Sequence, residues 1–318
     1  MNRATVALTK CTQYSPDKMS ACLRRHFELL GGLAKFVRAG DSVLIKPNFI
    51  APRSADHATQ THPVIIIELA KLLLDFGAKP FVGDSPAWQD VFACAKKLRL
   101  DEPLKKLGVL IRQLDTPKKC IVGDDNFSLR LSKVALDADV IINLPKFKSH
   151  QQLGATFAVK NMFGCVPGKR KPLWHFRKGG DPQQFCRLLI DIYRYLNPAL
   201  TIVDAVFAMD GPGPINGRTR PLGWIISSTD PVACETVCAK LINTEPDKFP
   251  IIRTAKQVNF GCANINEIQI VGDDYRNDIC TDFEPAALIP IRFSLAHVCK
   301  SVAKQVLMLT GLHSTASH

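Results

Sequence analysis

The sequence predicts an α/β fold in which an open, mostly parallel sheet carries helices on both faces and is followed by a C-terminal amphipathic helix. Short apolar segments alternate along the chain with longer segments of helical periodicity, a pattern typical of parallel strands joined by helices. Hydrophobic residues make up 46% of the 318 residues, which is enough for a sizeable core. We expect residues 1–286 to form one α/β domain and residues 287–318 a helical tail.

The expected elements follow in a regular order. Proline at a first turn marks the predicted helices that begin at Pro63, Pro182 and Pro231, and apolar residues spaced by three or four predict a helix after Pro16. The predicted strands are 6–8, 42–45, 80–82, 109–111, 127–134, 140–144, 200–204, 224–227 and 267–271, and the predicted helices are 16–37, 63–76, 88–107, 182–196, 231–242 and 287–312.

The charge of the chain limits the classes of partner. The formal net charge of +12 favours an anionic substrate, an acidic protein or a membrane surface. We expect no nucleic acid, because the basic residues are spread out without interleaved aromatic residues. The N-terminus has no signal-peptide core, and no apolar run is long enough to span a bilayer, so we expect a cytoplasmic protein.

The eleven cysteines do not form a recognisable metal or cluster motif. They include no Cys-x-x-Cys pair and no ferredoxin-type series, so we expect no intrinsic iron–sulfur cluster of that type. Buried free thiols are the ordinary interpretation, and they fit a reducing compartment. A cluster assembled from scattered cysteines is the alternative.

Four predicted strands end in unusual polar loops, at residues 43–49, 81–86, 140–150 and 200–214. The carboxyl ends of parallel strands lie along one edge of a sheet, so these loops can converge although they are distant in sequence. The sequence therefore predicts a ligand-binding rim at this edge.

The segment after residue 144 contains several side chains that could bind an anion or transfer a proton. Lys146, Lys148 and His150 alternate, which places them on one side of the backbone if the chain is extended. Two ammonium groups would hold an anion and lower the histidine pKa, favouring a neutral general base. A solvated lysine-rich loop with a structural histidine is the alternative.

Further candidates follow in the same region. Lys160 lies between apolar residues, which would make it a better nucleophile or cofactor anchor, although a lysine with its stem packed on a helix surface has the same pattern. His175, between Trp174 and Phe176, is a candidate acid/base or metal ligand, or a packed structural histidine. Lys169 begins a basic cluster that extends to Lys178 and suits a phosphate, a carboxylate or an acidic docking partner.

Two carboxylates, Asp84 and Asp210, stand at strand-to-loop junctions beside glycine, where they could orient a cation or a histidine. Asp84 could instead cap the next helix and Asp210 brace a turn. Gly211 and Gly213 only loosely resemble a phosphate-binding loop. The predicted catalytic residues are His150, Lys160, His175 and Asp84, and the predicted binding residues are Lys46, Asn48, Lys146, Lys148, Asn161, Lys169, Asp210, Gly211 and Gly213.

Seven motifs make the chain resemble the domain of unknown function 362 family: VLIKPNF, THP, GAKPFVGDSP, ADVIINLPKFKSH, AVKNMFGCVPG, IVDAVFAMDGPGP and SSTDPVACETV. Many members carry a ferredoxin-like segment, which implies redox work. This chain lacks that segment, so the resemblance implies that electrons would come from a separate iron–sulfur protein, such as an acidic ferredoxin. The family often has aspartate where Glu235 stands.

A fainter pattern is similar to the nickel-pincer lactate racemases: Ser149-His150, then Lys160, then Pro167-Gly168. This resemblance implies that His150 is an acid/base, that Lys160 binds a pincer nucleotide covalently, and that His175 ligates nickel. The racemase's other catalytic histidine has no counterpart near residues 83–86.

Together these patterns predict an enzyme that performs redox or proton-transfer chemistry on a small anionic substrate. One alternative is a non-catalytic redox partner or scaffold that docks an acidic ferredoxin. Another is a nickel-pincer-type racemase or epimerase. The C-terminal helix is a candidate contact for a homo-oligomer.

Overall fold

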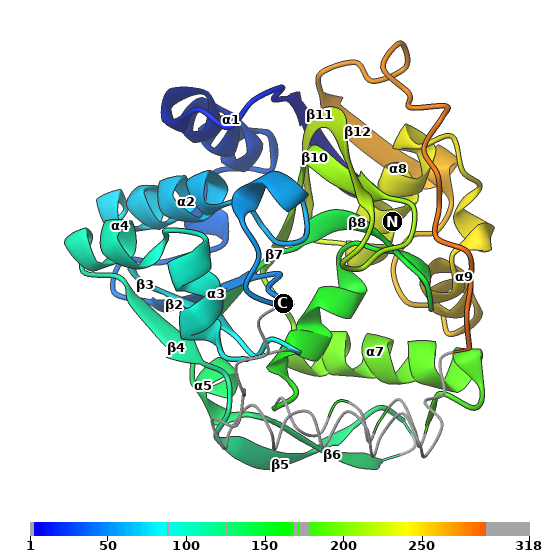
Figure 1. The fold of residues 1–318 in the computed structure, drawn as a ribbon, viewed down its shortest axis with the longest axis horizontal. Coiled ribbons are helices and arrows are strands. Elements are labelled where there is room, and N and C mark those ends of the chain that lie inside the picture. The colour runs from blue at the N-terminus through cyan, green and yellow to red at the C-terminus, as the bar shows by residue number, and fades with distance from the viewer. Residues whose placement is uncertain are drawn as a thin grey trace, which may run out of the picture.

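The computed structural model describes residues 3–87, 89–124, 126–167, 171, 174 and 178–290. Its centre is a large sheet whose main path is β12 (Ile268–Gly272), β1 (Ala4–Lys10), β11 (Arg218–Ser228), β10 (Leu200–Asp210), β7 (Val140–Leu144), β2 (Ser42–Pro47), β3 (Lys79–Asp84) and β4 (Leu110–Gln113) (Figure 1). Beside this path, β8 (Lys146–His150) pairs with β10 and with β9 (Gly154–Thr156).

The sheet is mostly parallel, as predicted. The strands β10, β7, β2, β3 and β4 are parallel neighbours, whereas β11 runs antiparallel to both β10 and β1. Consequently, the four strands whose polar ends were predicted to converge lie side by side, in the order β10, β7, β2, β3. The predicted rim is one continuous edge.

Helices cover both faces of the sheet, and residues along each strand alternate between the two cores. On β2, Val43 and Ile45 face one core, whereas Leu44 faces the other. The first core lies under α1 (Pro16–Leu29), α2 (Pro63–Asp75), α3 (Val91–Lys97) and α4 (Asp101–Lys106), and the second under α5 (Lys133–Leu136), α7 (Pro182–Leu196), α8 (Pro231–Leu241) and α9 (Pro250–Gln257).

Short turns and a hairpin complete the described chain. The strands β5 (Pro117–Val122) and β6 (Phe127–Ser132) form a separate antiparallel pair, seen at the bottom of Figure 1. The 3-10 turns are η1 (Leu33–Lys35), η2 (Ala55–His57), η3 (Val159–Cys165), η5 (Pro246–Lys248) and η6 (Ile265–Glu267). Within the residues that the structure describes, no helix has the length and apolar character needed to cross a bilayer.

Several predicted boundaries were wrong. The single helix expected over residues 88–107 is two helices, separated where Arg99 adopts a left-handed backbone conformation with φ of 54°. The strand expected over 200–204 extends to Asp210, because its second half pairs with β11 as a long hairpin. Residues 146–150, expected as a loop, form the strand β8.

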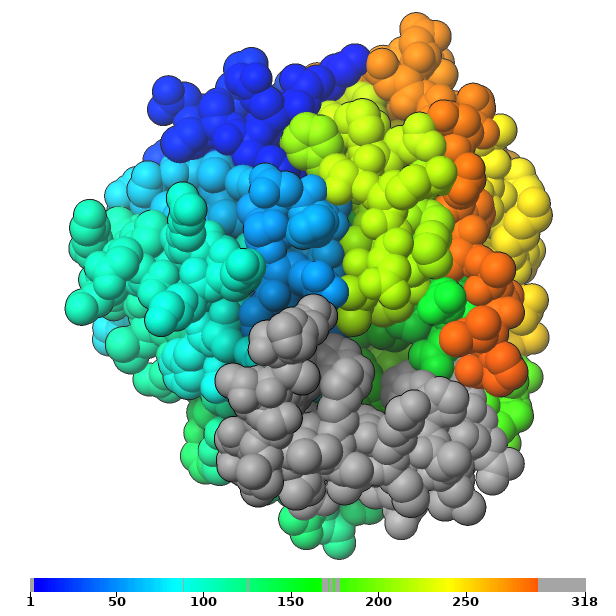
Figure 2. All heavy atoms as spheres, in the orientation of Figure 1, coloured from blue at the N-terminus to red at the C-terminus, as the bar shows by residue number. Residues whose placement is uncertain are grey.

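The C-terminal segment leaves the sheet as an irregular strap. Residues 287–290 are not helical, and the rest of the predicted C-terminal helix lies outside the described residues. Figure 2 shows the orange atoms before residue 290 running along the yellow-green atoms of β10 and β11. The strap is attached there by a hydrogen bond from Gly211 N to Glu284 O (2.7 Å) and an ion pair between Arg220 and Asp282 (2.8 Å). The domain boundary at residue 286 stays a prediction.

Candidate functional site

A small cavity of about 90 Å³ lies at the carboxyl ends of β2 and β3, on the predicted rim. Its charged lining residues are Lys46, Asp84, Lys148, Lys160 and Lys171. They come from β2, β3, β8, η3 and the chain beyond η3, so sheet topology brings them together. Four lysines therefore face one carboxylate.

Lys46 and Asp84 form a buried ion pair between neighbouring parallel strands. Lys46 Nζ lies 2.8 Å from Asp84 Oδ1, and the two side chains are 0% and 2% exposed. Lys46 Nζ also donates to Pro47 O (2.6 Å). The Asp84 carboxylate accepts from the backbone N–H groups of Phe49 and Ser85, both at 2.7 Å. Both charges are thus paired, and the carboxylate is held by two strand ends.

The backbone of Gly164 packs directly against this ion pair. A Cβ atom at this position would lie 2.6 Å from Asp84 Oδ1 and from Lys46 Nζ. We expect Gly164→Ala to push the pair apart and to lower the free energy of unfolding by about 1–3 kcal/mol, the usual cost of overpacking. Chemical denaturation measures this loss. Unchanged stability would mean that η3 moves freely away from the pair.

The other three lysines have no carboxylate partner among the described residues. Lys148 Nζ donates to Thr59 O (2.9 Å), and Lys171 Nζ donates to Ser85 O. Lys160 Nζ makes no hydrogen bond or ion pair with the part of the chain that the structure describes. Within the part of the chain that the structure describes, these three amines share the cavity with a single carboxylate, Asp84, which is already paired with Lys46.

Burial and mutual repulsion lower the pKa of these lysines. Burial is the larger cause for Lys160 and Lys171, and each pKa falls to about 8. The pKa of Lys148 falls well below its ordinary value because of burial and then the nearby charge of Lys160. The cavity thus holds amines that can gain or lose a proton near neutral pH.

Amide and hydroxyl groups complete the lining. Asn161 Nδ2 donates to Lys46 O (3.1 Å) and to Asn143 Oδ1 (2.8 Å), and Asn161 Oδ1 accepts from Asn48 Nδ2 (2.9 Å). These hydrogen bonds fix the orientation of the Asn48 side chain and leave its Oδ1 buried without a hydrogen-bond partner in the described structure. Ser85 Oγ is unpartnered in the same way. Both residues line the cavity, so both atoms are available to a ligand or a water molecule.

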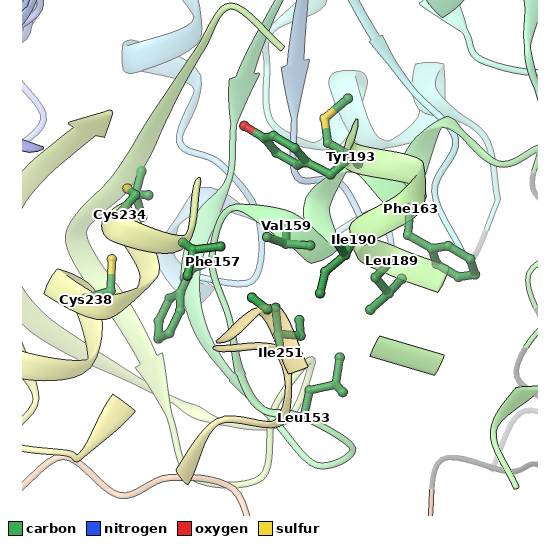
Figure 3. Close-up of a cluster of buried hydrophobic side chains, with 14 of the residues drawn as sticks. Leu153, Phe157, Val159, Phe163, Leu189, Ile190, Tyr193, Cys234, Cys238 and Ile251 are labelled. Atoms are coloured by element: carbon green, nitrogen blue, oxygen red, sulfur yellow. The ribbon is translucent and has the colours of Figure 1, made fainter. Parts of the chain in front are cut away.

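The hydrophobic core fixes the position of Lys160. Its neighbour Val159 and, one turn later, Phe163 belong to the core cluster, and Figure 3 shows Val159 beside Ile190 of α7. Glu235 of α8 accepts a hydrogen bond from Val159 N (2.8 Å). Because the residues around it are held in the core, Lys160 is left on the cavity side.

Lys146 belongs to a separate buried network. Its Nζ lies 3.0 Å from Asp204 Oδ2 and donates to the Tyr14 hydroxyl (2.7 Å), which in turn donates to Asp204 Oδ1 (2.6 Å). His62 stacks on Tyr14 with ring centroids 3.5 Å apart. The structure therefore separates Lys146, which pairs with a carboxylate, from Lys148, which faces the cavity.

Four of the remaining predicted residues, all of them described, are not in the cavity lining. His150 is buried, and its Nδ1 accepts from Gln152 N (3.1 Å). Asp210 binds the guanidinium groups of Arg218 (3.3 Å) and Arg220 (2.9 Å). Gly211 O accepts from Ser149 Oγ (2.8 Å), and Gly213 packs against the backbone of the same serine. Lys169 and His175 lie outside the described residues.

Sequence reasoning missed Ser85, Tyr14 and Asp204, and it did not single out Lys171 within its basic cluster. Ser85 follows Asp84 directly, so the motif was visible but its hydroxyl had no distinguishing pattern. Tyr14 is 190 residues from Asp204, and no local signal connects them.

This chain is similar to a known protein family, to a protein of known sequence and to a solved structure. A family model described as Domain of unknown function (DUF362) matches residues 43–240. The Thylakoid-associated protein sll1697 of Synechocystis sp. is 34% identical over 309 residues, which cover 94% of each chain. The lactate racemase apoprotein from Thermoanaerobacterium thermosaccharolyticum matches with a TM-score of 0.50 at 13% identity, over 76% of this chain and 58% of that one. The last likeness concerns the fold alone, and it confirms the predicted α/β class with a large, mostly parallel sheet.

Proposed function

We propose a function from two premises: this chain belongs to the Domain of unknown function (DUF362) family, and it holds a lysine-rich cavity at the carboxyl ends of its parallel strands. The proposed function is that of an enzyme that binds a small anionic molecule in this cavity and transfers a proton to or from it. The observation that carries the proposal is the set of three cavity lysines, Lys148, Lys160 and Lys171, without a carboxylate partner in the described structure.

Electrostatics favour an anionic ligand. Removing an ammonium group from water is costly unless an opposite charge and hydrogen bonds replace the water. Lys46 receives that compensation from Asp84 (2.8 Å), whereas among the described residues Lys148 and Lys171 contact only carbonyl oxygens and Lys160 has no polar partner. A bound carboxylate or phosphate would supply the missing charge. The unpartnered acceptors Asn48 Oδ1 and Ser85 Oγ suit hydroxyl or water donors accompanying it.

Lys160 is the group best placed to move the proton. A general acid or base works best when its pKa is close to the working pH, and the pKa of Lys160 is about 8. Its amine has no competing hydrogen bond to the described residues. Negative charge that develops on a substrate would be stabilised by Lys148 and Lys171 in the same cavity.

The described donor set does not fit a nickel ion. Among the described residues, no group of three or more histidine, cysteine, aspartate or glutamate side chains could hold a metal ion. The nitrogen donors in the cavity are lysines and asparagines, which are not the imidazole and thiolate ligands that such metals prefer. His175 lies outside the described residues, and we derive no step through nickel.

Three further predictions stay part of this proposal. An acidic ferredoxin would dock on the basic residues of segment 169–178, most of which are not described. A homo-oligomer would form through the C-terminal segment. A cytoplasmic location agrees with free cysteines, although the Synechocystis relative is named as thylakoid-associated. Cell fractionation tests the location, and recovery with membranes after a high-salt wash would contradict it.

Anion binding provides the direct test of the cavity. We expect inorganic phosphate or malonate to bind the wild-type chain, and Lys160→Gln and Lys171→Gln each to weaken binding about tenfold or more, because a hydrogen bond to a charged group contributes about 1.5–3 kcal/mol. Isothermal titration calorimetry measures the affinities. The matched control is Lys119→Gln, since Lys119 is an exposed lysine on β5. Equal affinities in the control and the cavity variants would refute the site.

The pH dependence of this binding has a definite sign. Anions bind the ammonium form, so affinity for phosphate is expected to fall as the pH rises through about 8, where Lys160 and Lys171 lose their protons. The double variant Lys160→Gln/Lys171→Gln should lose most of this dependence. Titrations at pH 7 and 9.5 measure the difference, and an affinity that stays constant in the wild type would contradict the assignment.

A further inference from the structure

One amine in the lysine-rich cavity is not engaged by the described residues. Lys46 pairs with a carboxylate, and Lys148 and Lys171 each donate a hydrogen bond to a backbone carbonyl oxygen. Lys160 lines the same cavity, but its Nζ has no hydrogen-bond acceptor in the part of the chain that the structure describes. Its side chain is half-buried, so a small molecule in the cavity can reach it. Among the described residues, the four cavity lysines thus comprise three with hydrogen-bond acceptors and one that is available for a reaction.

The chain on both sides of Lys160 is held in place. Val159 N donates to a carboxylate oxygen of Glu235 on α8 (2.8 Å), and the side-chain amide of Asn161 donates to Lys46 O (3.1 Å). Val159 and Asn161 are both buried. A fixed backbone limits the positions that the Lys160 amine can occupy, and a reacting group that is held near its target gains rate through proximity.

The surroundings of Lys160 also favour its nucleophilic form. A lysine attacks a carbon atom only when its amine is neutral, and desolvation or a neighbouring cation increases the neutral fraction. Both conditions are met, because Lys160 shares a small, partly apolar cavity with Lys148 and Lys171. Burial and then the charge of Lys171 lower the pKa of Lys160 to about 8, so part of this amine is neutral near pH 7.

The size and lining of the cavity limit the ligand. Its volume of about 90 Å³ is well below the roughly 300–1,000 Å³ of a pocket for a drug-sized molecule, so it accommodates only a few non-hydrogen atoms. Ile50, Phe157, Phe163 and Pro214 form an apolar part of the lining beside the lysines. A ligand that matches both parts carries an anionic group at one end and a short alkyl group at the other.

We propose that the cavity binds a short-chain 2-oxo acid and that Lys160 forms a Schiff base with its carbonyl carbon. The inference rests on the proposed function, since the carboxylate of the acid occupies the same anion site beside Lys148 and Lys171. A 2-oxo acid meets these constraints because its reactive carbon is bonded directly to the carboxylate, within short reach of an amine in the same small cavity. The alkyl group of the acid packs on the apolar part of the lining.

The reaction balances without an oxidant or a reductant. The neutral Lys160 amine attacks the carbonyl carbon, so that a C–N bond forms and the carbonyl π electrons move to the oxygen. Lys148 and Lys171 stabilise the negative charge that develops there. A proton then passes from the nitrogen to the oxygen, which is the proton transfer of the proposed function at a defined atom. Uptake of one further proton expels the oxygen as water and leaves an iminium ion.

Reductive trapping of the full chain tests the proposal. The chain is incubated with pyruvate and sodium cyanoborohydride, which reduces an iminium ion to a stable secondary amine, and a digest is mapped by mass spectrometry. We expect the adduct on Lys160, with a yield about tenfold or more above that on the exposed Lys119, because proximity favours the reaction in the cavity. Inorganic phosphate should suppress the Lys160 adduct by competing for the anion site. Equal yields on the two lysines overturn the proposal.

Two controls define the carbonyl compound and the nucleophile. Acetone has a carbonyl group but no carboxylate, so it should label Lys160 about tenfold or more weakly than pyruvate does. Equal labelling by acetone overturns the assignment of a 2-oxo acid. Lys160→Arg retains a positive charge, but its guanidinium stays protonated, so this variant should give no adduct in the cavity. If the variant does not fold, the map of the wild-type chain still locates the adduct.

Phosphate binding separates the failure of this inference from the failure of the proposed function. If phosphate binds in calorimetry but pyruvate leaves no adduct on Lys160, the Schiff base is overturned while the anion site stands. If neither phosphate binding nor an adduct is observed, both are overturned.

Discussion

Replacing Asp84 with asparagine is expected to lower the free energy of unfolding by about 3–5 kcal/mol, the usual cost of breaking a buried ion pair from one side. The Lys46 ammonium, 0% exposed, would remain buried without its counter-charge. The carboxylate oxygens that now accept from Lys46, Phe49 and Ser85 would be replaced by one amide oxygen and a donor group that cannot accept. Chemical denaturation measures this loss.

A double variant separates the ion pair from the other effects of the substitution. Lys46→Met combined with Asp84→Asn removes both charges, so no uncompensated ammonium remains in the interior. We expect this double variant to be more stable than Asp84→Asn alone, since replacing a buried pair by apolar groups is often nearly neutral. If Asp84→Asn costs less than about 1 kcal/mol, or if the double variant is the less stable protein, the pair does not organise the site as we describe.

Glu235 is expected to make folding stability fall as the pH rises from about 4.5 to about 8. Its side chain is 2% exposed, and burial raises its pKa from 4.5 to about 8. Between these values the folded protein holds a proton that the unfolded chain has released, so the stabilisation is complete below about 4.5 and is lost by about 8. The slope approaches about 1.4 kcal/mol per pH unit. Denaturation curves at pH 5, 6, 7 and 8 measure it.

The variant Glu235→Gln isolates this contribution. Glutamine retains an oxygen that can accept from Val159 N, but it does not titrate, so the difference in stability between wild type and variant should change steadily over the window. The titration of other groups, such as Lys160, contributes equally to the free energy of unfolding of both proteins and therefore cancels in that difference. Glu102→Gln, an exposed glutamate on α4, is the matched control and should show no such change. A constant difference for Glu235→Gln would show that the buried carboxyl titrates normally.

Much of the fold could be predicted from local patterns. Prolines at Pro63, Pro182 and Pro231 mark the starts of α2, α7 and α8, because a missing N–H is harmless in a first turn. The break at Arg99 could not be predicted, since the apolar periodicity continues across it. The strand β5 also escaped prediction, because four of its six residues are exposed and only its pairing with β6 defines it.

The sequence predicted where the candidate site lies, at the carboxyl ends of the strands, but only part of the set of residues that line it. Lys46, Asn48, Asp84, Lys148, Lys160 and Asn161 were all singled out, and all line the cavity. His150 and Asp210 were singled out by the same reasoning, yet they bond elsewhere. A polar residue at a strand end has the same sequence pattern whether its side chain meets a cavity or an arginine on the next strand.

The sequence by itself determined that four strand ends meet along one edge, because apolar strands joined by helices form a parallel sheet whose carboxyl ends coincide. Only the tertiary structure decided which of two nearby lysines lines the cavity. Lys146 and Lys148 stand two residues apart on β8, but Asp204 of β10 neutralises the first, whereas Thr59 offers the second only a carbonyl oxygen. The physical reason is that the charge state and availability of a buried amine depend on its neighbours in space, and those neighbours come from distant parts of the chain.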